Sequence, residues 1–193
     1  QSEWARAVVV KNGLAFIVGE REFQDEVFIV YKRAFLARVH PLGSVEPLWT
    51  SWGVHSANDA ARAITSCGEM LVAGGWDRDD PVDAKPEPLI LWFNADGTFS
   101  DRRPDALAWT QLNGIACDRE NKIVSAGTRS TGDGDALAFT VLGSVDQPTW
   151  YDKGVADPDG AAAVACDPRG FCAIAGFRTA NGKSYAVVRV HHP

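Results

Sequence analysis

The chain alternates between short apolar runs and clusters of Gly, Pro, Asn and Asp, without the periodicity of an amphipathic helix. Four segments repeat one pattern, in which an apolar strand, a polar turn and a second apolar strand end in a glycine. The segments are residues 6–19, 62–74, 114–127 and 163–176. Self-similarity that recurs roughly every 50 residues predicts an all-β protein built from four repeated units.

Each unit continues beyond its glycine. A third strand is predicted at residues 35–39, 89–93, 137–141 and 185–190. A tryptophan then marks a fourth strand in the first three units, at Trp49, Trp109 and Trp150. Four antiparallel strands in roughly 50 residues are the plan of a β-propeller blade, and we expect these outer-strand tryptophans to pack between blades.

We therefore predict a single domain over residues 1–193, folded as a four-bladed β-propeller. The predicted blades are residues 5–52, 60–110, 111–152 and 160–193. The last unit stops after its third strand, so we expect residues 1–4 to add its outer strand, with Trp4 in the place of the outer-strand tryptophan. This pairing would close the ring and hide the strand edges. The alternative is that the chain is part of a larger propeller.

Three short motifs resemble a known repeat. They are Ile115-Ala-Cys-Asp118, Ile123-Val-Ser-Ala-Gly127 and Asn94-Ala-Asp-Gly97. The sequence resembles the delta-60 and SBBP-like propeller repeats of secreted bacterial proteins, in which an Asp marks the turn, the second strand ends in Ala-Gly and the third closes in Asp-Gly. The resemblance implies a propeller fold and a location outside the cytoplasm, and it brings no catalytic residues with it.

The four cysteines give two separate predictions. Cys166 and Cys172 flank a Pro- and Gly-containing turn, so they would face each other across a hairpin at a distance that suits a disulfide. Two small buried thiols are the alternative. Cys67 and Cys117 occupy matching positions in adjacent units, and we expect such positions to lie beyond the roughly 7 Å that bridged Cα atoms allow. We predict that these two do not bond to each other.

Composition and charge exclude several classes of protein. With 19 basic and 25 acidic residues the net charge is −6, which argues against binding nucleic acid or an anionic lipid surface. No apolar run is long enough to span a membrane. The first residue is Gln1, and we expect either a removed signal peptide or a longer parent protein. A secreted or periplasmic location agrees with the repeat resemblance.

In a propeller, the connections from second to third strand and from fourth to first strand lie on one face, which we call the loop face. Two residues beyond the four glycines stand Arg21, Trp76, Arg129 and Arg178. Three arginines at one repeated position could hold a carboxylate or phosphate. The alternative, favoured by the acidic composition, is that each arginine pairs with an Asp or Glu of its own or the next blade.

Acidic residues on the loop face complete the candidate site. They are Asp77, Asp79, Asp80, Asp133 and Asp135. The first three could ligate Ca²⁺, but the spacing is not that of an EF-hand loop, and we favour a protein without a cofactor.

No nucleophile elbow, zinc-protease motif or phosphate-binding loop occurs, and His55 has no nucleophile beside it in the sequence. We predict a non-catalytic binding or scaffold module that presents its loop face to a protein partner. The alternative is a carbohydrate-binding or carbohydrate-active propeller. There Trp76 would stack on a sugar ring, and acid pairs such as Asp77 with Asp80 or Asp133 with Asp135 would act on a glycosidic bond. A third interpretation is a piece of an enzyme whose active site lies elsewhere.

Overall fold

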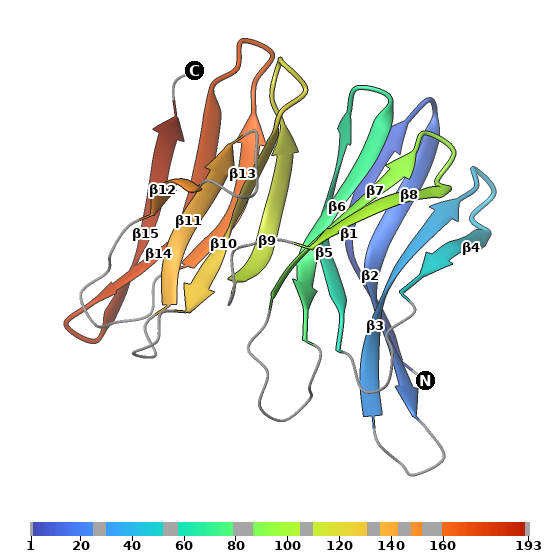
Figure 1. The fold of residues 1–193 in the computed structure, drawn as a ribbon, viewed down its shortest axis with the longest axis horizontal. Coiled ribbons are helices and arrows are strands. Elements are labelled where there is room, and N and C mark those ends of the chain that lie inside the picture. Colours follow the sequence, from blue (N-terminus) through green and yellow to red (C-terminus); the bar gives the residue numbers. More distant parts are fainter. Residues whose placement is uncertain are drawn as a thin grey trace.

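The computed structural model describes residues 2–24, 30–51, 58–78, 87–104, 110–130, 136–142, 148–151 and 160–191. These residues form strands and turns only, which confirms the all-β prediction (Figure 1). Among them, no helix is long and apolar enough to cross a membrane. The strands form four antiparallel sheets, and in each sheet neighbouring strands are consecutive in the sequence.

We call the sheets blades one to four. Blade one holds β1 (Glu3–Lys11), β2 (Leu14–Gln24), β3 (Val30–Val39) and β4 (Val45–Thr50). Blade two holds β5 (Ala60–Cys67), β6 (Met70–Asp77), β7 (Glu87–Asn94) and β8 (Phe99–Pro104). Blade three holds β9 (Thr110–Cys117), β10 (Ile123–Ser130), β11 (Ala136–Leu142) and β12 (Pro148–Tyr151). Blade four holds β13 (Gly160–Cys166), β14 (Cys172–Ala180) and β15 (Lys183–His191).

The first hairpin of each blade closes through local turn chemistry. Asn12 and Gly13 both have positive φ, at 51° and 75°, which is the backbone of the commonest two-residue hairpin turn. In blades three and four an aspartate side chain stabilises the hairpin turn instead. The Asp118 Oδ1 atom accepts hydrogen bonds from the backbone N–H groups of Glu120 and Lys122, both at 2.8 Å. The Asp167 side chain makes the equivalent contacts, which explains why the repeat places Asp at the turn.

The blades pack face to face, and apolar side chains fill the space between each pair. Phe16 and Leu36 of blade one contact Leu71 and Phe93 of blade two in one buried cluster. Trp49 on β4 extends this cluster, because its ring meets the edge of Phe93 at 5.5 Å. The predicted packing role of Trp49 is thus confirmed. Trp109 lies outside the described residues, and for Trp150 only the backbone strand is described.

A β-bulge in the first strand sets the register of each blade. The bulged residues are Arg6, Arg62, Asn113 and Ala162. Two residues before each bulge, a backbone carbonyl oxygen lies over a glycine of the second strand. A Cβ atom on that glycine would lie about 2 Å from the oxygen, a distance that no side chain tolerates. The four glycines are Gly19, Gly75, Gly127 and Gly176.

This register corrects the sequence alignment, which used Gly74 in the second unit. Gly74 meets only side-chain atoms of Ile115 and Leu112, at 3.4 Å or more, and its backbone is not under a carbonyl. Because Gly74 and Gly75 are adjacent, the sequence alone does not show which of them matches the glycines of the other three units. Only the position of the bulge at Arg62 distinguishes them.

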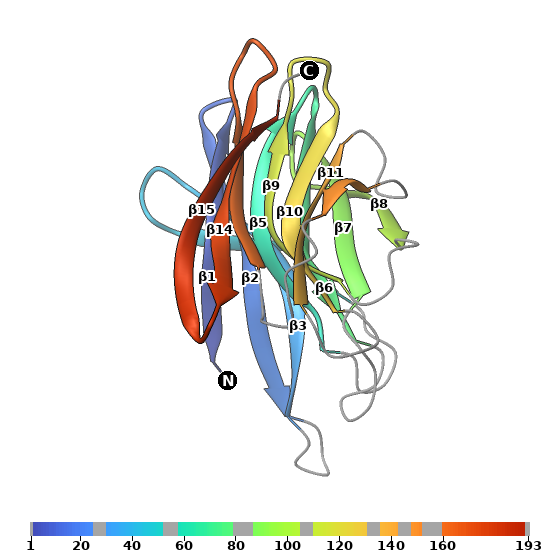
Figure 2. The ribbon, with the colours of Figure 1, turned by 90° about the vertical axis from the view of Figure 1, so that its left-hand side faces the viewer.

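The prediction that residues 1–4 complete the last blade is wrong. Glu3 and Trp4 belong to β1, where they pair with Arg21 and Glu20 of β2, and the described residues of blade four form three strands. The long β2 strand offers backbone partners along its whole length, so the leading residues pair within their own blade. The four blades form an open row, and the N- and C-terminal ends lie at opposite ends of it (Figures 1 and 2).

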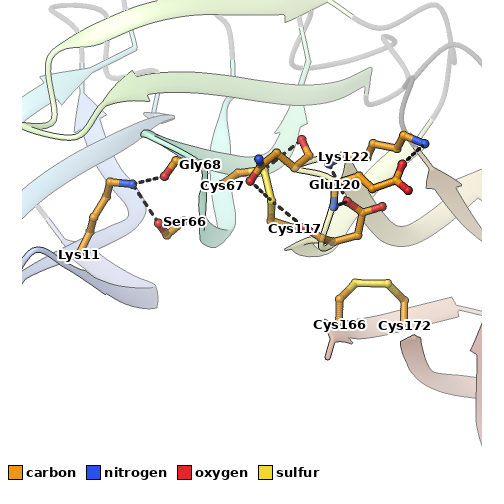
Figure 3. The surroundings of a disulfide bond; sticks show 11 residues. Lys11, Ser66, Cys67, Gly68, Cys117, Glu120, Lys122, Cys166 and Cys172 are labelled. Atoms are coloured by element: carbon orange, nitrogen blue, oxygen red, sulfur yellow. Dashed lines mark hydrogen bonds and ion pairs between the residues drawn. A yellow bond between two sulfur atoms is a disulfide. The ribbon is translucent and has the colours of Figure 1, made fainter. Parts of the chain in front are cut away.

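One of the two cysteine predictions is confirmed and the other is wrong. Cys166 and Cys172 form the expected disulfide across the β13–β14 hairpin. Cys67 and Cys117 are also bonded, against our prediction, with Cα atoms 5.3 Å apart (Figure 3). The first strands of neighbouring blades come much closer than expected, because small residues line them. A Cβ on Gly114 of β9, for example, would lie 2.9 Å from the Ala163 Cα of β13.

Candidate functional site

The loop face is where β2, β6, β10 and β14 end (Figure 1). The turns between the first and second strands of each blade lie at the opposite end, which we call the turn face. On the loop face the described residues of blades one and two form a charged cluster. It consists of Arg6, Glu20, Lys32, Asp59, Arg62, Trp76, Asp77, Arg78 and Arg102.

The structure places only some of the candidate residues. Arg21 forms an ion pair with Glu3 of its own blade at 2.5 Å, the arrangement that the acidic composition favoured. Arg178 is half-buried on β14, and of Arg129 only the strand backbone is described. The other acidic candidates lie outside the described residues, as does His55. These acidic residues are Asp79, Asp80, Asp133 and Asp135.

The corrected register changes which residues are equivalent. Two residues beyond the four glycines stand Arg21, Asp77, Arg129 and Arg178. Trp76 is therefore not the counterpart of the arginines. Its place in the repeat is held by Glu20 in blade one, one residue after Gly19. The repeated position carries three cations and one carboxylate, and that carboxylate, Asp77, forms an ion pair with Arg102 of the same blade.

Glu20 is the anionic centre of the blade-one part of the cluster. Only 2% of it is exposed, although it lies in the middle of an ionic network. Its carboxylate forms an ion pair with the bulge residue Arg6, and the Lys32 Nζ atom lies 3.6 Å away. The Lys32 ammonium also lies 5.0 Å from the centre of the Trp4 ring, close enough for a cation–π contact. This buried anion therefore holds two cations at the loop-face end of blade one.

Arg62, the bulge residue of blade two, connects the charged cluster to blades three and four. Its Nη1 atom donates a hydrogen bond to the Asn113 Oδ1 atom at 3.0 Å, and Asn113 Nδ2 donates to the Ala161 carbonyl at 3.0 Å. The Arg62 guanidinium also lies over the Trp76 ring at 6.0 Å, as Arg78 does at 5.9 Å. Burial lowers the pKa of Arg62, and the negative charge of Glu20 partly offsets this. Polar contacts made by the bulge residues Arg62 and Asn113 thus join blades two, three and four.

Asp59 lies where blades one and two meet. Its backbone N–H donates to the Lys32 carbonyl at 2.9 Å, and the preceding Asn58 N–H donates to the Arg78 carbonyl at 3.0 Å. The segment is therefore hydrogen-bonded to both blades. The Asp59 carboxyl group is buried, with 1% of the residue exposed, beside the Asp77 carboxyl group and the Ser51 hydroxyl group.

Burial, together with the neighbouring Asp77 carboxyl group, raises the pKa of Asp59 to about 7. Ser51 and Arg102 act in the opposite direction. Asp59 is thus a buried acid that takes up or releases its proton close to neutral pH.

This buried acid gives the protein a pH-dependent stability. Unfolded Asp59 loses its proton near pH 4, whereas folded Asp59 keeps it until about pH 7. The contribution of Asp59 to the free energy of unfolding is therefore fully present below pH 4 and is lost as the pH rises to about 7. We expect the free energy of unfolding to fall by up to about 4 kcal/mol as the pH rises through this window. The Asp59→Asn variant should lack the fall, and urea unfolding at pH values across the window measures it.

Asp96 provides the matched control for this experiment. Hydrogen bonds from the backbone and side chain of Thr98 lower its pKa, so its contribution is lost only as the pH falls below the usual Asp range. Asp96→Asn should leave the slope between pH 4 and 7 as it is in the wild type. A slope that persists in Asp59→Asn would show that another group titrates.

Sequence reasoning missed most of this cluster. Arg6 and Arg62 open the first two repeat segments at matching positions, which is a signal that an alignment of the units could have used. Glu20 is conspicuous as an acid directly after Gly19 in an apolar strand. Asp59 carries no such signal, because its burial depends on how two blades meet.

The cluster brings charges of both signs and an aromatic ring together at the loop face. It offers guanidinium groups, an ammonium group and an indole ring around buried carboxylates. The described residues hold no group of three or more His, Cys, Asp and Glu side chains that could bind a metal ion. No protein-family model matches the chain, and no curated protein matches it.

Proposed function

We propose that this chain is a non-catalytic binding or scaffold module that presents its loop face to a protein partner. One observation carries the proposal: the half-buried Trp76 lies beside Arg62 and Arg78 at the loop face, on strands fixed by packing on both sides. Trp and Arg are the residue types that most often dominate the binding energy of protein interfaces. Backbone hydrogen bonds from Asn58 and Asp59 hold this end of the two blades together, so the surface is pre-organised for binding.

The location of the protein belongs to the same proposal. Two disulfides in a chain of this size support an oxidising compartment, and we propose that the protein is secreted or periplasmic. A bacterial origin rests on the repeat resemblance alone.

The finer architecture is also part of the proposal. The blades have the strand order, bulges and face-to-face packing of a propeller. Among the described residues, the outer faces of blades one and four carry exposed apolar side chains, with Val10 66% exposed and Val188 68% exposed. These features support a propeller of more than four blades, to which this chain contributes four.

Carbohydrate binding has less support. The two guanidinium groups over Trp76 occupy part of the ring surface that a sugar would need. Calcium binding at Asp77 has less support as well, because Asp77 already forms an ion pair with Arg102. A glycan array tests the first alternative, and a calcium titration followed by melting temperature tests the second.

The partner proposal predicts that binding is lost when the loop face changes and kept when the turn face changes. We expect Trp76→Ala and Arg78→Glu each to weaken capture of a cross-linked protein partner by about tenfold or more. Arg119→Glu, the same charge reversal in the exposed β9–β10 turn, should leave capture as it is. The measurement is quantitative mass spectrometry of proteins cross-linked to each variant in an extracytoplasmic fraction. Equal capture by all variants would contradict a loop-face interface.

A further inference from the structure

The two ends of the blade row expose faces that are buried everywhere else in the row. We call Gly19, Gly75, Gly127 and Gly176 the repeat glycines. In blades one, two and three, the residues one and three positions before the repeat glycine face the following blade. Phe16 and Val18 are fully buried in this way, as are Val72 and Ala126. In blade four the same positions are Ala173 and Ala175, and both are exposed.

Blade four therefore presents the face that a following blade would cover. On β14 and β15 every described side chain at the centre of this face is apolar. These side chains are Ala173, Ala175, Phe177, Ala186, Val188 and Val190. The two largest aliphatic residues, Val188 and Val190, are 68% and 56% exposed. An apolar patch of this extent on a sheet face is typical of a protein–protein contact.

Blade one presents the opposite face, the one that a preceding blade would cover. In blades two and four, Ala73 and Ile174 stand two positions before the repeat glycine and are packed against the preceding blade. The equivalent residue of blade one, Ile17, instead lines an open hollow of about 360 Å³. Phe35, Ala37, Val45 and Pro47 line the same hollow, and the Glu3–Arg21 ion pair lies at its edge.

We infer that a second copy of this chain covers both faces. The blade-four face of each copy packs on the blade-one face of the other, and the two copies form a closed ring of eight blades with two-fold symmetry. The contact continues the three blade interfaces already inside the chain, because the same repeat positions meet on each side. On the blade-four side the covered side chains are apolar, and on the blade-one side the Glu3 and Arg21 charges beside the hollow are already paired with each other.

The size of the contact agrees with a stable dimer. Three strands of about nine residues cover roughly 400 Å² of sheet face. Two such contacts between two copies would bury about 1,600 Å² in total, the size of a typical specific protein interface. A single contact alone would bury about half of that, so closing the ring with both contacts is what makes the dimer stable. The inference stands apart from the loop-face proposal, because the loop face is left free in the ring.

The experiment is light scattering during size-exclusion chromatography, with native mass spectrometry as a second readout. The wild-type chain should run at twice 20.8 kDa. Val188→Glu and Val10→Glu should each raise the dissociation constant of the dimer by about a hundredfold or more, since each places a charge in both contacts. Leu42→Glu changes a residue that is 98% exposed in the β3–β4 turn, and this control should stay dimeric.

Mixing provides a sharper test. One copy with Val10→Glu and one with Val188→Glu can form a mixed dimer in which one contact is entirely wild-type. In native mass spectrometry, the mixed dimer should stay assembled at lower protein concentrations than the dimer of either variant alone. Equal melting temperatures of the dilute variants would show that both fold. A wild-type monomer at high concentration, a filament, or a dimer insensitive to both substitutions would overturn the inference, and none of these results bears on partner capture at the loop face.

Discussion

Replacing Cys67 and Cys117 together by alanine is expected to lower the free energy of unfolding by about 4 kcal/mol. The disulfide closes a loop with a sequence separation of 50 residues and joins β5 of blade two to β9 of blade three. Without it, the unfolded chain gains the conformational freedom that this long closed loop had removed. Denaturant unfolding of the oxidised wild type and of the double variant measures the difference.

The second disulfide supplies the matched comparison. Cys166 and Cys172 are only six residues apart, so the Cys166→Ala and Cys172→Ala pair should cost less, about 2 kcal/mol. The order of the two effects is the decisive result. A larger loss from the short loop would mean that chain entropy is not what the long disulfide contributes.

Substituting Gly75 by alanine is the other change with a large expected effect. The new Cβ would lie 1.8 Å from the Ala60 carbonyl oxygen and 2.9 Å from the Ala61 Cα, both backbone atoms that cannot turn aside. The bulge at Arg62 would have to open, at a cost of about 3 kcal/mol or more. Thermal and urea unfolding of the variant measure this loss.

The neighbouring glycine makes the test specific. In Gly74→Ala the Cβ would meet side-chain atoms of Ile115 at 3.4 Å and of Leu112 at 3.7 Å, which is close to ordinary contact. We expect a change within about 1 kcal/mol, because alanine also restricts the unfolded chain. If Gly74→Ala were the more damaging substitution, the bulge register of blade two would be wrong.

Much of the fold follows from the repetition in the sequence. Each unit must bury an apolar face that it cannot bury alone, so four similar units predict stacked sheets without further information. Trp49 is an example. A tryptophan recurs in the predicted outer strand of the units, and this recurrence was enough to place Trp49 between two blades, where it contacts Phe93. The Cys166–Cys172 disulfide was equally accessible, since both residues flank one short turn.

The features that sequence reasoning missed all depend on distances between units. The Cys67–Cys117 bond requires β5 and β9 to lie side by side, and local patterns contain no measure of that separation. The pairing of Glu3 and Trp4 with β2 depends on the length of a strand that the pattern ended at Gly19. In the candidate site, Asp77 could be found as a loop-face acid, but its partner Arg102 lies on another strand of the blade.

The connections between blades two and three differ at their two ends. On the turn face, the Cys67–Cys117 disulfide joins blade two to blade three covalently, and hydrogen bonds from Lys11 to Ser66 and the Gly68 carbonyl tie blade one to the same end of blade two (Figure 3). On the loop face, the Arg62–Asn113 hydrogen bond is the corresponding polar link. Any motion that separates these blades must therefore hinge at the cysteines and widen toward the loops. Amide hydrogen exchange should accordingly be faster at the start of β9 than at its end, and a molecule held at the loop face would slow it.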